Sequence, residues 1–493
     1  MTPIDFFERA ARAWPGRPAL LGPQGDMSYA ELAQAVDALA CHLQACDPEP
    51  GSRVALCAGN RVEYVVAMLA IMAAGKVWVP LNARSTAREL ARILDTVSAS
   101  IVMVDAKGAE LVGECNATVL SLDTLAPVFE RHAGRKPRVH ERGRDATQAI
   151  KFTGGTTGLP KGVMQPMRAW VATIINQIAG WQITAQDRFV AAAPLSHGTG
   201  TYVLPTLAQG GAIILVDGRN PDALLRAFSE QGGSMTFMPP TLIYKLMELP
   251  GATPAAFPDL RLLIYGGAPM PESKIVAAQG FFGPVLATTF GQTEAPQIVT
   301  WLTPDLLADT GLRNSVGRAT WFSEVAIVAP DGSRLGPGEK GEVLVRGDLV
   351  MTGYWQQPEL SARTVRDGWL HTGDVGMLDE RGFLFLKERL RDVIISGGFN
   401  VYPVDVEGVL SEHAAVHEAA VFGLPDDKWG ETVNAVIELR PGNQVEADAL
   451  KAFVRERVGP VLTPKNIWFC ESLPRSPVGK VLKADLRRDY ETH

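Results

Sequence analysis

A glycine- and threonine-rich segment, Phe152 to Gly162, most constrains how this chain can fold. It reads Phe-Thr-Gly-Gly-Thr-Thr-Gly-Leu-Pro-Lys-Gly and follows the short apolar run Ala149-Ile150, which is typical of a strand end. Glycines let backbone N–H groups turn towards one point, and threonines add hydroxyl donors. Lys161 adds a cation on a flexible stem. The segment predicts a phosphate-binding loop after a strand, although loops of this composition also form ordinary surface turns.

The segment is not a P-loop. That motif requires G-x-x-x-x-G-K-[ST], whereas here Lys161 is preceded by Pro160 and followed by Gly162. If the segment binds phosphate, it does so as part of a different motif.

Helical and strand patterns alternate on both sides of this loop. Residues 29–43 have apolar side chains at three- and four-residue spacing, and Ser28 with Glu31 predicts a capping box at their start. Short apolar runs indicate buried strands at 53–58, 77–81, 101–105, 189–193, 212–216, 234–237 and 261–265. This rhythm predicts an α/β fold whose large N-terminal domain contains two doubly wound sheets.

The pattern changes after about residue 315. Residues 315–388 contain short strands separated by Gly/Pro turns, which predict a small antiparallel barrel or sheet. The last hundred residues again mix strand and helix and predict a small α+β domain. Four charges in Glu388–Asp392 indicate an exposed linker, so we predict domains at 1–390 and 391–493.

Composition excludes several classes of protein. The 493 residues are 46% hydrophobic and carry a net charge of −7, which does not suggest nucleic-acid binding. The five cysteines form no CxxC pair, and the N-terminus lacks the apolar segment of a signal peptide. The longest apolar run, 65–75, is shorter than the roughly 20 residues of a membrane helix. We expect a cytoplasmic protein without an integral membrane segment, either a monomer or a homodimer.

The phosphate loop resembles that of the adenylate-forming superfamily, which includes acyl-CoA synthetases, peptide-synthetase adenylation domains and firefly luciferase. Further segments resemble the family's other motifs, in the family's order. They are Tyr265-Gly266-Gly267-Ala268-Pro269, Thr288-Thr289-Phe290-Gly291-Gln292-Thr293-Glu294, Trp369-Leu370-His371-Thr372-Gly373-Asp374, Arg389, and Pro474-Arg475-Ser476-Pro477-Val478-Gly479-Lys480. The resemblance therefore covers the whole chain.

The resemblance implies a site for ATP and Mg²⁺. Phe290 would stack on adenine, Asp374 and Arg389 would bind the ribose, and Thr293 would donate to the α-phosphate. Glu294, together with Thr157, would hold Mg²⁺, which prefers hard oxygen ligands. The implied nucleotide-binding residues are Thr153, Gly154, Gly155, Thr156, Thr157, Gly158, Lys161, Gly266, Gly267, Ala268, Pro269, Phe290, Gly291, Gln292, Asp374 and Arg389. Gly154 departs from the family, where serine is usual.

The C-terminal motifs imply catalysis by a mobile lysine and a second substrate, CoA. Lys480 would bridge the substrate carboxylate and the α-phosphate, where a cation offsets the repulsion between the two anions. Gly397 and Gly398 resemble the segment that CoA ligases turn towards the site in their second step. Trp429 would lie along the pantetheine arm, and Arg391 would be the hinge.

The identity of the carboxylic acid is open. The resemblance places His197, Thr199, Pro240, Thr241 and Gln297 around it. No arginine or lysine stands out to bind a second carboxylate, so an aromatic acid or a medium- or long-chain fatty acid is favoured. Stand-alone loading of a carrier protein and luciferase-like oxidation are the alternatives to an acyl-CoA synthetase. A non-catalytic nucleotide-binding protein would lack Lys480 or Glu294, and both are present.

Overall fold

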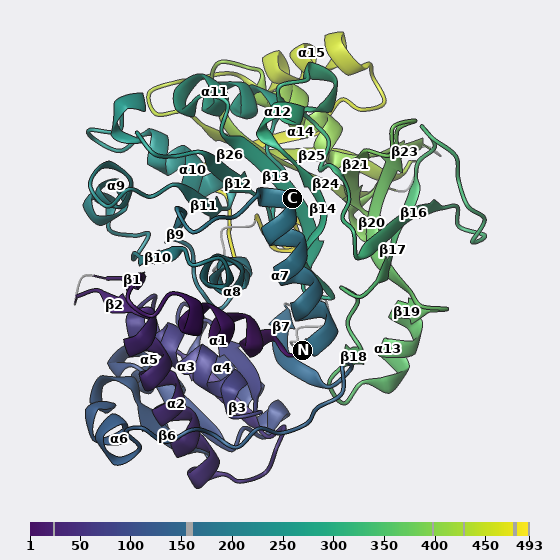
Figure 1. Cartoon of the computed structure of the whole chain (residues 1–493). Coiled ribbons are helices and arrows are strands. Elements are labelled where there is room, and N and C mark those ends of the chain that lie inside the picture. Colours follow the sequence, from purple (N-terminus) through teal and green to yellow (C-terminus); the bar gives the residue numbers. More distant parts are fainter. Residues whose placement is uncertain (23–24, 154–160, 397–398, 427–428, 477–480, 492–493) are drawn as a thin grey trace.

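The computed structural model describes residues 1–22, 25–153, 161–396, 399–426, 429–476 and 481–491. Two large sheets form most of the chain, and a small sheet connects them to a C-terminal unit (Figure 1). The mixed α/β class predicted from the sequence is confirmed.

The first large sheet carries the phosphate loop. Its order is β18-β8-β7-β4-β3-β5-β6, with a parallel centre and with β8 and β18 antiparallel at one edge. The strands are β3 (Arg53–Cys57), β4 (Val77–Leu81), β5 (Ile101–Val104), β6 (Thr118–Ser121), β7 (Thr147–Thr153), β8 (Lys161–Pro166) and β18 (Gly353–Tyr354).

The second large sheet carries the turns that resemble the adenine and acid sites. Its order is β15-β14-β13-β12-β11-β9-β10-β1-β2, and the strands from β13 to β1 run parallel. The strands are β1 (Pro18–Leu21), β2 (Met27–Ser28), β9 (Arg188–Ala191), β10 (Ala212–Leu215), β11 (Met235–Met238), β12 (Leu262–Tyr265), β13 (Leu286–Gln292), β14 (Ala295–Leu302) and β15 (Arg318–Ala319).

Helices cover both faces of these sheets. The helices are α1 (Pro3–Ala13), α2 (Tyr29–Cys46), α3 (Val62–Ala73), α4 (Ala87–Val97), α5 (Ala106–Val112), α6 (Ala126–Arg131), α7 (Met167–Trp181), α8 (Val203–Ala208), α9 (Pro221–Ser229), α10 (Pro240–Met247), α11 (Glu272–Phe282) and α12 (Pro304–Leu307). The predicted capping box is present, since the Ser28 side chain accepts from the N–H of Glu31.

One apolar core lies between the two large sheets. In β3, Val54 and Leu56 face this shared core, whereas Ala55 and Cys57 face the outer helices. Successive strand side chains point to opposite faces, so a strand covered on both sides reads as an unbroken apolar run. This explains why short apolar runs predicted the central strands.

The segment after residue 315 forms an antiparallel sheet of order β16-β17-β20-β19, with β21 beside β20. The sequence predicted either a barrel or a sheet here, and the strand pairings among the described residues form a sheet. Its elements are β16 (Ser323–Val328), β17 (Gly341–Gly347), β19 (Val365–Arg366), β20 (Trp369–Leu378), β21 (Leu384–Arg389) and the helix α13 (Pro358–Thr364).

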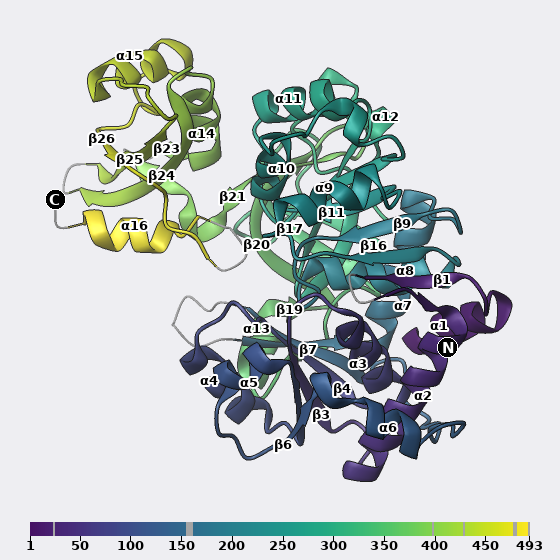
Figure 2. The same ribbon diagram turned by 90° about the vertical axis from the view of Figure 1, so that its left-hand side faces the viewer.

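The C-terminal elements form a separate unit beside α10 and α11 (Figure 2). Its sheet has the order β23-β22-β25-β24, with β26 beside β25. The elements are β22 (Ile394–Ser396), β23 (Phe399–Val401), α14 (Pro403–Ser411), β24 (Val416–Asp426), β25 (Gly430–Leu439), α15 (Ala447–Val458), β26 (Asn466–Cys470) and α16 (Lys483–Tyr490). The boundary at residue 390 stays a prediction.

The expectation of a fully exposed linker was wrong for Glu388. Its side chain is only 12% exposed because Lys483 Nζ lies 2.9 Å from its carboxylate. The same Nζ lies 3.0 Å from Glu407. Burial raises the pKa of Glu388. Burial alone would lower the pKa of Lys483, but the negative charges of Glu407 and Glu388 outweigh it, so the pKa of Lys483 is raised. Residues on both sides of position 391 therefore share one buried ion cluster, which sequence spacing could not reveal.

We predict that Lys483→Met destabilises the chain by about 3 kcal/mol, because it leaves two buried carboxylates without their cation. Lys387→Met is the matched control: Lys387 lies 3.0 Å from a single carboxylate, that of Asp405, which is 31% exposed. The control variant should change stability by less than about 1 kcal/mol. Thermal unfolding of the two variants measures the difference, and equal losses would contradict this ranking.

Candidate active site

Asp374, Arg389 and Gln292 meet at the junction of the small sheet and the second large sheet. Asp374 and Arg389 are register partners on β20 and β21, and Arg389 Nε lies 2.8 Å from Asp374 Oδ1. The Gln292 amide, at the end of β13, donates to the Asp374 carboxylate and to the carbonyl oxygen of Thr372 at 3.1 Å. The structure thus brings together three residues that the family motifs place around the nucleotide. Their roles in ribose binding stay predictions.

A second cluster forms around Glu294, two residues after Gln292. The Tyr354 hydroxyl donates to Glu294 Oε1 at 2.9 Å, and Lys161 Nζ lies 5.5 Å from the centre of the Tyr354 ring. Burial raises the pKa of Tyr354, and the charge of Glu294 raises it further, so the hydroxyl stays a donor. Tyr354 was missed in the sequence, because it comes from a two-residue strand far from the recognised motifs.

The ends of the phosphate loop are fixed, since Thr153 and Lys161 are register partners on β7 and β8. The carbonyl oxygen of Thr293 accepts from Gln165 Nε2 at 2.8 Å, which ties β8 to the Glu294 segment. The following predicted site residues lie outside the described part of the chain: Gly154, Gly155, Thr156, Thr157, Gly158, Gly397, Gly398 and Lys480.

The predicted adenine and acid residues surround a buried ring, Phe237. A Cβ placed on Gly198 would lie 2.9 Å from that ring and 2.8 Å from Gln297 Oε1, and one on Gly266 would lie 3.0 Å from the ring. Phe237 stacks on Tyr202, with ring centres 5.3 Å apart. The segments that carry His197, Gln297 and Gly266 therefore converge on one aromatic floor, whose central residue the sequence did not single out.

The remaining predicted residues lie on the same strand ends. A Cβ on Gly291 would lie 2.6 Å from the carbonyl carbon of Gln297, so only glycine fits there. Pro240 and Thr241 begin α10 directly after β11. The turn after β12 holds Gly266 to Pro269, with Gly267 at a φ of 79° and exposed. Phe290 is 8% exposed and packs in the core below the small sheet, and its stacking on adenine stays a prediction.

Comparison with known proteins agrees with this geometry. Residues 7–355 match the AMP-binding enzyme family, and residues 405–480 match the C-terminal domain of AMP-binding enzymes. The chain belongs to the AMP-binding enzyme family. This places it in the adenylate-forming superfamily, as the sequence motifs predicted.

Its relatives include several CoA ligases. A feruloyl-CoA synthase of Amycolatopsis sp is 35% identical, covering 97% of this chain and 98% of the relative. A long-chain-fatty-acid–CoA ligase of Mycobacterium tuberculosis is 32% identical, covering 98% of both chains. Among solved structures, the amide bond synthetase McbA of Marinactinospora thermotolerans has a TM-score of 0.91 at 32% identity, covering 99% of this chain and all of McbA.

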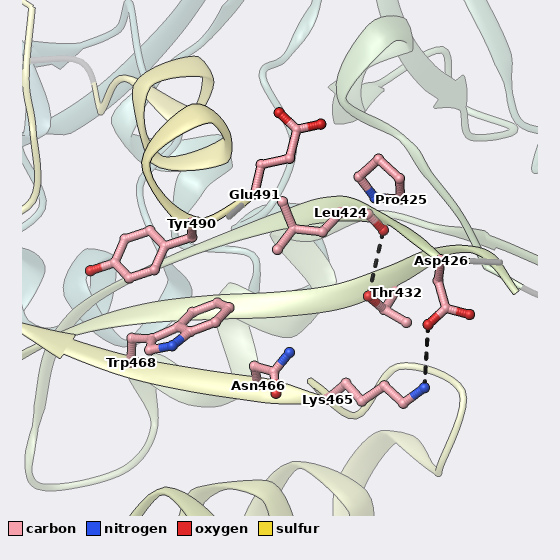
Figure 3. Close-up of a pocket in the computed structure, with 9 residues that line it drawn as sticks. All are labelled: Leu424, Pro425, Asp426, Thr432, Lys465, Asn466, Trp468, Tyr490 and Glu491. Carbon is pink, nitrogen blue, oxygen red and sulfur yellow. Dashed lines mark hydrogen bonds and ion pairs between the residues drawn. The ribbon is translucent and has the colours of Figure 1, made fainter. Parts of the chain in front are cut away.

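The C-terminal unit of this AMP-binding enzyme contains a separate pocket of about 440 Å³ (Figure 3). The rings of Trp468 and Tyr490 lie 4.6 Å apart on one side, and Lys465 lies 3.5 Å from Asp426 on the other. The N–H of Trp429, a predicted CoA residue that is 42% exposed, donates to Asp426. Among the described residues, none of the predicted nucleotide residues lines this pocket.

In the part of the chain that the structure describes, no helix is long and apolar enough to cross a membrane. The same residues contain no group of three potential metal ligands.

Lys151 is a buried cation that the sequence reasoning also missed. It lies on β7, two residues before Thr153, and is 8% exposed. Its Nζ lies 5.0 Å from the centre of the Trp78 ring and 5.4 Å from that of Trp170, and donates to the His197 carbonyl oxygen at 3.4 Å. Burial lowers the pKa of Lys151 to about 7. Its only sequence signal is a charge inside an apolar strand run.

We predict that Tyr354→Phe raises the KM for MgATP about 10-fold, because Glu294 loses a hydrogen bond to its charged group. Tyr64→Phe is the matched control, since the buried Tyr64 hydroxyl has no hydrogen-bond partner among the described residues. Initial rates at varied MgATP measure the effect. Equal changes in both variants would contradict a role for the Tyr354 hydroxyl at Glu294.

We predict that, between about pH 7 and pH 10, the wild type gains stability relative to Lys151→Met as the pH rises. In this window unfolded Lys151 binds a proton that the folded chain does not, so the gain is roughly 1 kcal/mol per pH unit. Below pH 7 both states bind the proton and the difference is constant. Urea unfolding at pH 6, 8 and 9 tests this, and a difference that does not change with pH would contradict it.

Proposed function

We propose that this chain is an acyl-CoA synthetase that activates a carboxylic acid with MgATP and then transfers the acyl group to CoA. One observation carries the proposal: Gln292 and Glu294 lie two residues apart, and each joins a different polar cluster. Gln292 donates to Asp374, which pairs with Arg389, and Glu294 accepts from Tyr354, whose ring lies 5.5 Å from Lys161 Nζ. Glu294 lies in the tight turn that joins Gln292 at the end of β13 to Ala295 at the start of β14, so the two clusters are neighbours, as the ribose and the phosphates of one nucleotide are.

The first half-reaction forms the acyl-adenylate. A carboxylate oxygen of the acid attacks the α-phosphorus, and the bond from that phosphorus to the bridging oxygen breaks, so pyrophosphate leaves. The residues fit this chemistry: Asp374 can accept from both ribose hydroxyls, and Glu294, held by Tyr354, offers the hard oxygen that Mg²⁺ prefers. When bound, Mg²⁺ supplies charge neutralisation at the phosphate oxygens. Lys480 supplies the cation between the two reacting anions.

The second half-reaction forms the thioester. The CoA sulfur attacks the acyl carbon, AMP leaves, and the thiol proton passes to solvent. No dedicated base is needed, because a thiol is a few per cent thiolate at pH 7. We propose that residues 391–493 turn about Arg391 between the two steps, which withdraws Lys480 and presents Gly397, Gly398 and Trp429 to CoA.

The similar proteins differ most in the molecule that accepts the acyl group, since one structural neighbour with a TM-score of 0.91 is an amide bond synthetase. A panel of carboxylic acids should be assayed for pyrophosphate release and for products with CoA, with a simple amine and with neither. Thioester formation supports the proposal. Pyrophosphate release with amide as the only product would overturn the acceptor, and no release with any acid would overturn the function.

We predict that Lys480→Ala lowers adenylation at least 100-fold but leaves thioester formation from supplied acyl-AMP within about 3-fold, because its charge acts only in the first step. Lys451→Ala, on the exposed side of α15, is the control and should leave both half-reactions unchanged. Single-turnover assays of each half-reaction provide the measurement. An equal loss in both would refute this division of labour.

A further inference from the structure

Polar atoms without partners gather on and beside α7. Among the described residues, buried side-chain atoms with no hydrogen-bond partner include Trp170 Nε1, Asn176 Oδ1 and Gln177 Oε1 from α7. Trp78 Nε1 and Thr199 Oγ1, on neighbouring elements, share this property. An unpaired buried polar atom costs about 1–3 kcal/mol, so such a group requires an explanation.

These atoms border the predicted acid site. Gln177 Nε2 donates to Thr201 Oγ1 at 3.2 Å, in the short helix Gly198–Tyr202 that carries Thr199. Thr173 Oγ1 donates to the carbonyl oxygen of Pro296 at 3.3 Å, one residue before Gln297 on β14. Gln177 and Thr173 therefore place one side of α7 against the two elements that carry predicted acid-binding residues.

Comparison with two other lysines shows what Lys151 lacks. Lys76 Nζ lies 2.5–2.8 Å from three oxygens, the backbone carbonyls of Asp47 and Glu49 and the hydroxyl of Ser52. Lys483 lies between two carboxylates. Lys151 has one carbonyl oxygen at 3.4 Å and no carboxylate partner anywhere in the described ranges. The same fold thus surrounds the buried Lys76 and the partly exposed Lys483 with oxygen partners, and leaves Lys151, against the backbone of His197, incompletely satisfied.

Aromatic contacts do not make up this difference. Cation–π contacts with Trp78 and Trp170 contribute about 0.5–2 kcal/mol, whereas burying an ammonium group costs several kcal/mol. The indole N–H groups of Trp78 and Trp170, whose rings contact Lys151, are unpaired donors. The unpaired hydroxyl of Thr199, two residues after His197 in the chain, can also donate. Unpaired donors beside an incompletely satisfied lysine are complementary to an oxygen acceptor on a ligand.

We propose that Lys151 and the hydroxyl of Thr199 determine specificity by binding a second oxygen function of the acid, remote from the carboxylate that is activated. The substrate class is then carboxylic acids that carry an additional acceptor oxygen, such as a phenolic hydroxyl, a keto group or a second carboxylate, rather than plain alkyl acids. This inference rests on the proposed function and differs from the sequence-based expectation, in which no arginine or lysine stood out to bind a second carboxylate.

The first test uses the wild-type enzyme and pairs of acids of equal size. One pair is a para-hydroxy and a para-methyl phenylpropenoic acid, and the other is a linear dicarboxylic acid and the monocarboxylic acid of equal chain length. We expect kcat/KM for pyrophosphate release to be at least 10-fold higher for the oxygen-bearing member of one or both pairs. The pair that discriminates identifies the kind of oxygen. Equal or reversed values in both pairs, with pyrophosphate released, would overturn the inference while leaving the proposed function intact.

Variants then assign the effect to the two residues. Lys151→Met keeps the length of the side chain beside the two indole rings, and Thr199→Val keeps the shape of the threonine. We expect each variant to lower kcat/KM for the preferred acid 10- to 100-fold and to change that of its apolar partner by less than 3-fold.

Two further measurements separate recognition from folding. Lys76→Met, which empties a lysine site with full partners, should lower the thermal midpoint without changing the ratio between paired acids. An unchanged ratio in folded Lys151→Met, or an equal loss for both acids of a pair, would overturn the assignment. If Lys151→Met does not fold, Thr199→Val decides the test. An unchanged kcat/KM ratio between the paired acids in Thr199→Val would overturn the assignment, and a lowered ratio would support the shared site.

Discussion

The apolar core shared by the two large sheets is the constraint on which the site depends. Strands of both sheets send every second side chain into it, so neither sheet can shift without disrupting the other. The strand ends that carry the phosphate loop, the Gly266 turn and the Glu294 segment are thereby held in fixed relation. A nucleotide and an acid need several groups placed together to a fraction of an ångström, and loops on a rigid scaffold provide that placement.

Much of this could be predicted from the sequence, for physical reasons. Strands buried on both faces are continuous apolar runs, and a capping box is a local hydrogen-bond pattern, so both can be recognised without tertiary information. The motifs also predicted that Asp374, Arg389 and Gln292 belong to one site, and the register of β20 and β21 brings them together.

What the sequence could not reveal depends on long-range packing. Tyr354 reaches Glu294 because a two-residue strand adds to the sheet edge beside β8. Phe237 lies under the predicted acid residues because glycines from two other segments approach its ring. Glu388 looked like a linker charge until Lys483, 95 residues later, proved to be its partner. In each case the partner is far away in sequence, so no spacing rule applies.

The buried cluster of Glu388, Lys483 and Glu407 has a thermal consequence for any movement of the C-terminal unit. Separating the C-terminal unit from the main body returns one ammonium and two carboxylates to water. The hydration free energy of such ions becomes less favourable as temperature rises. Heating should therefore favour the docked arrangement at this junction, even while it loosens the apolar contacts around it. If the C-terminal unit moves as proposed, this junction would oppose its separation more strongly at higher temperature.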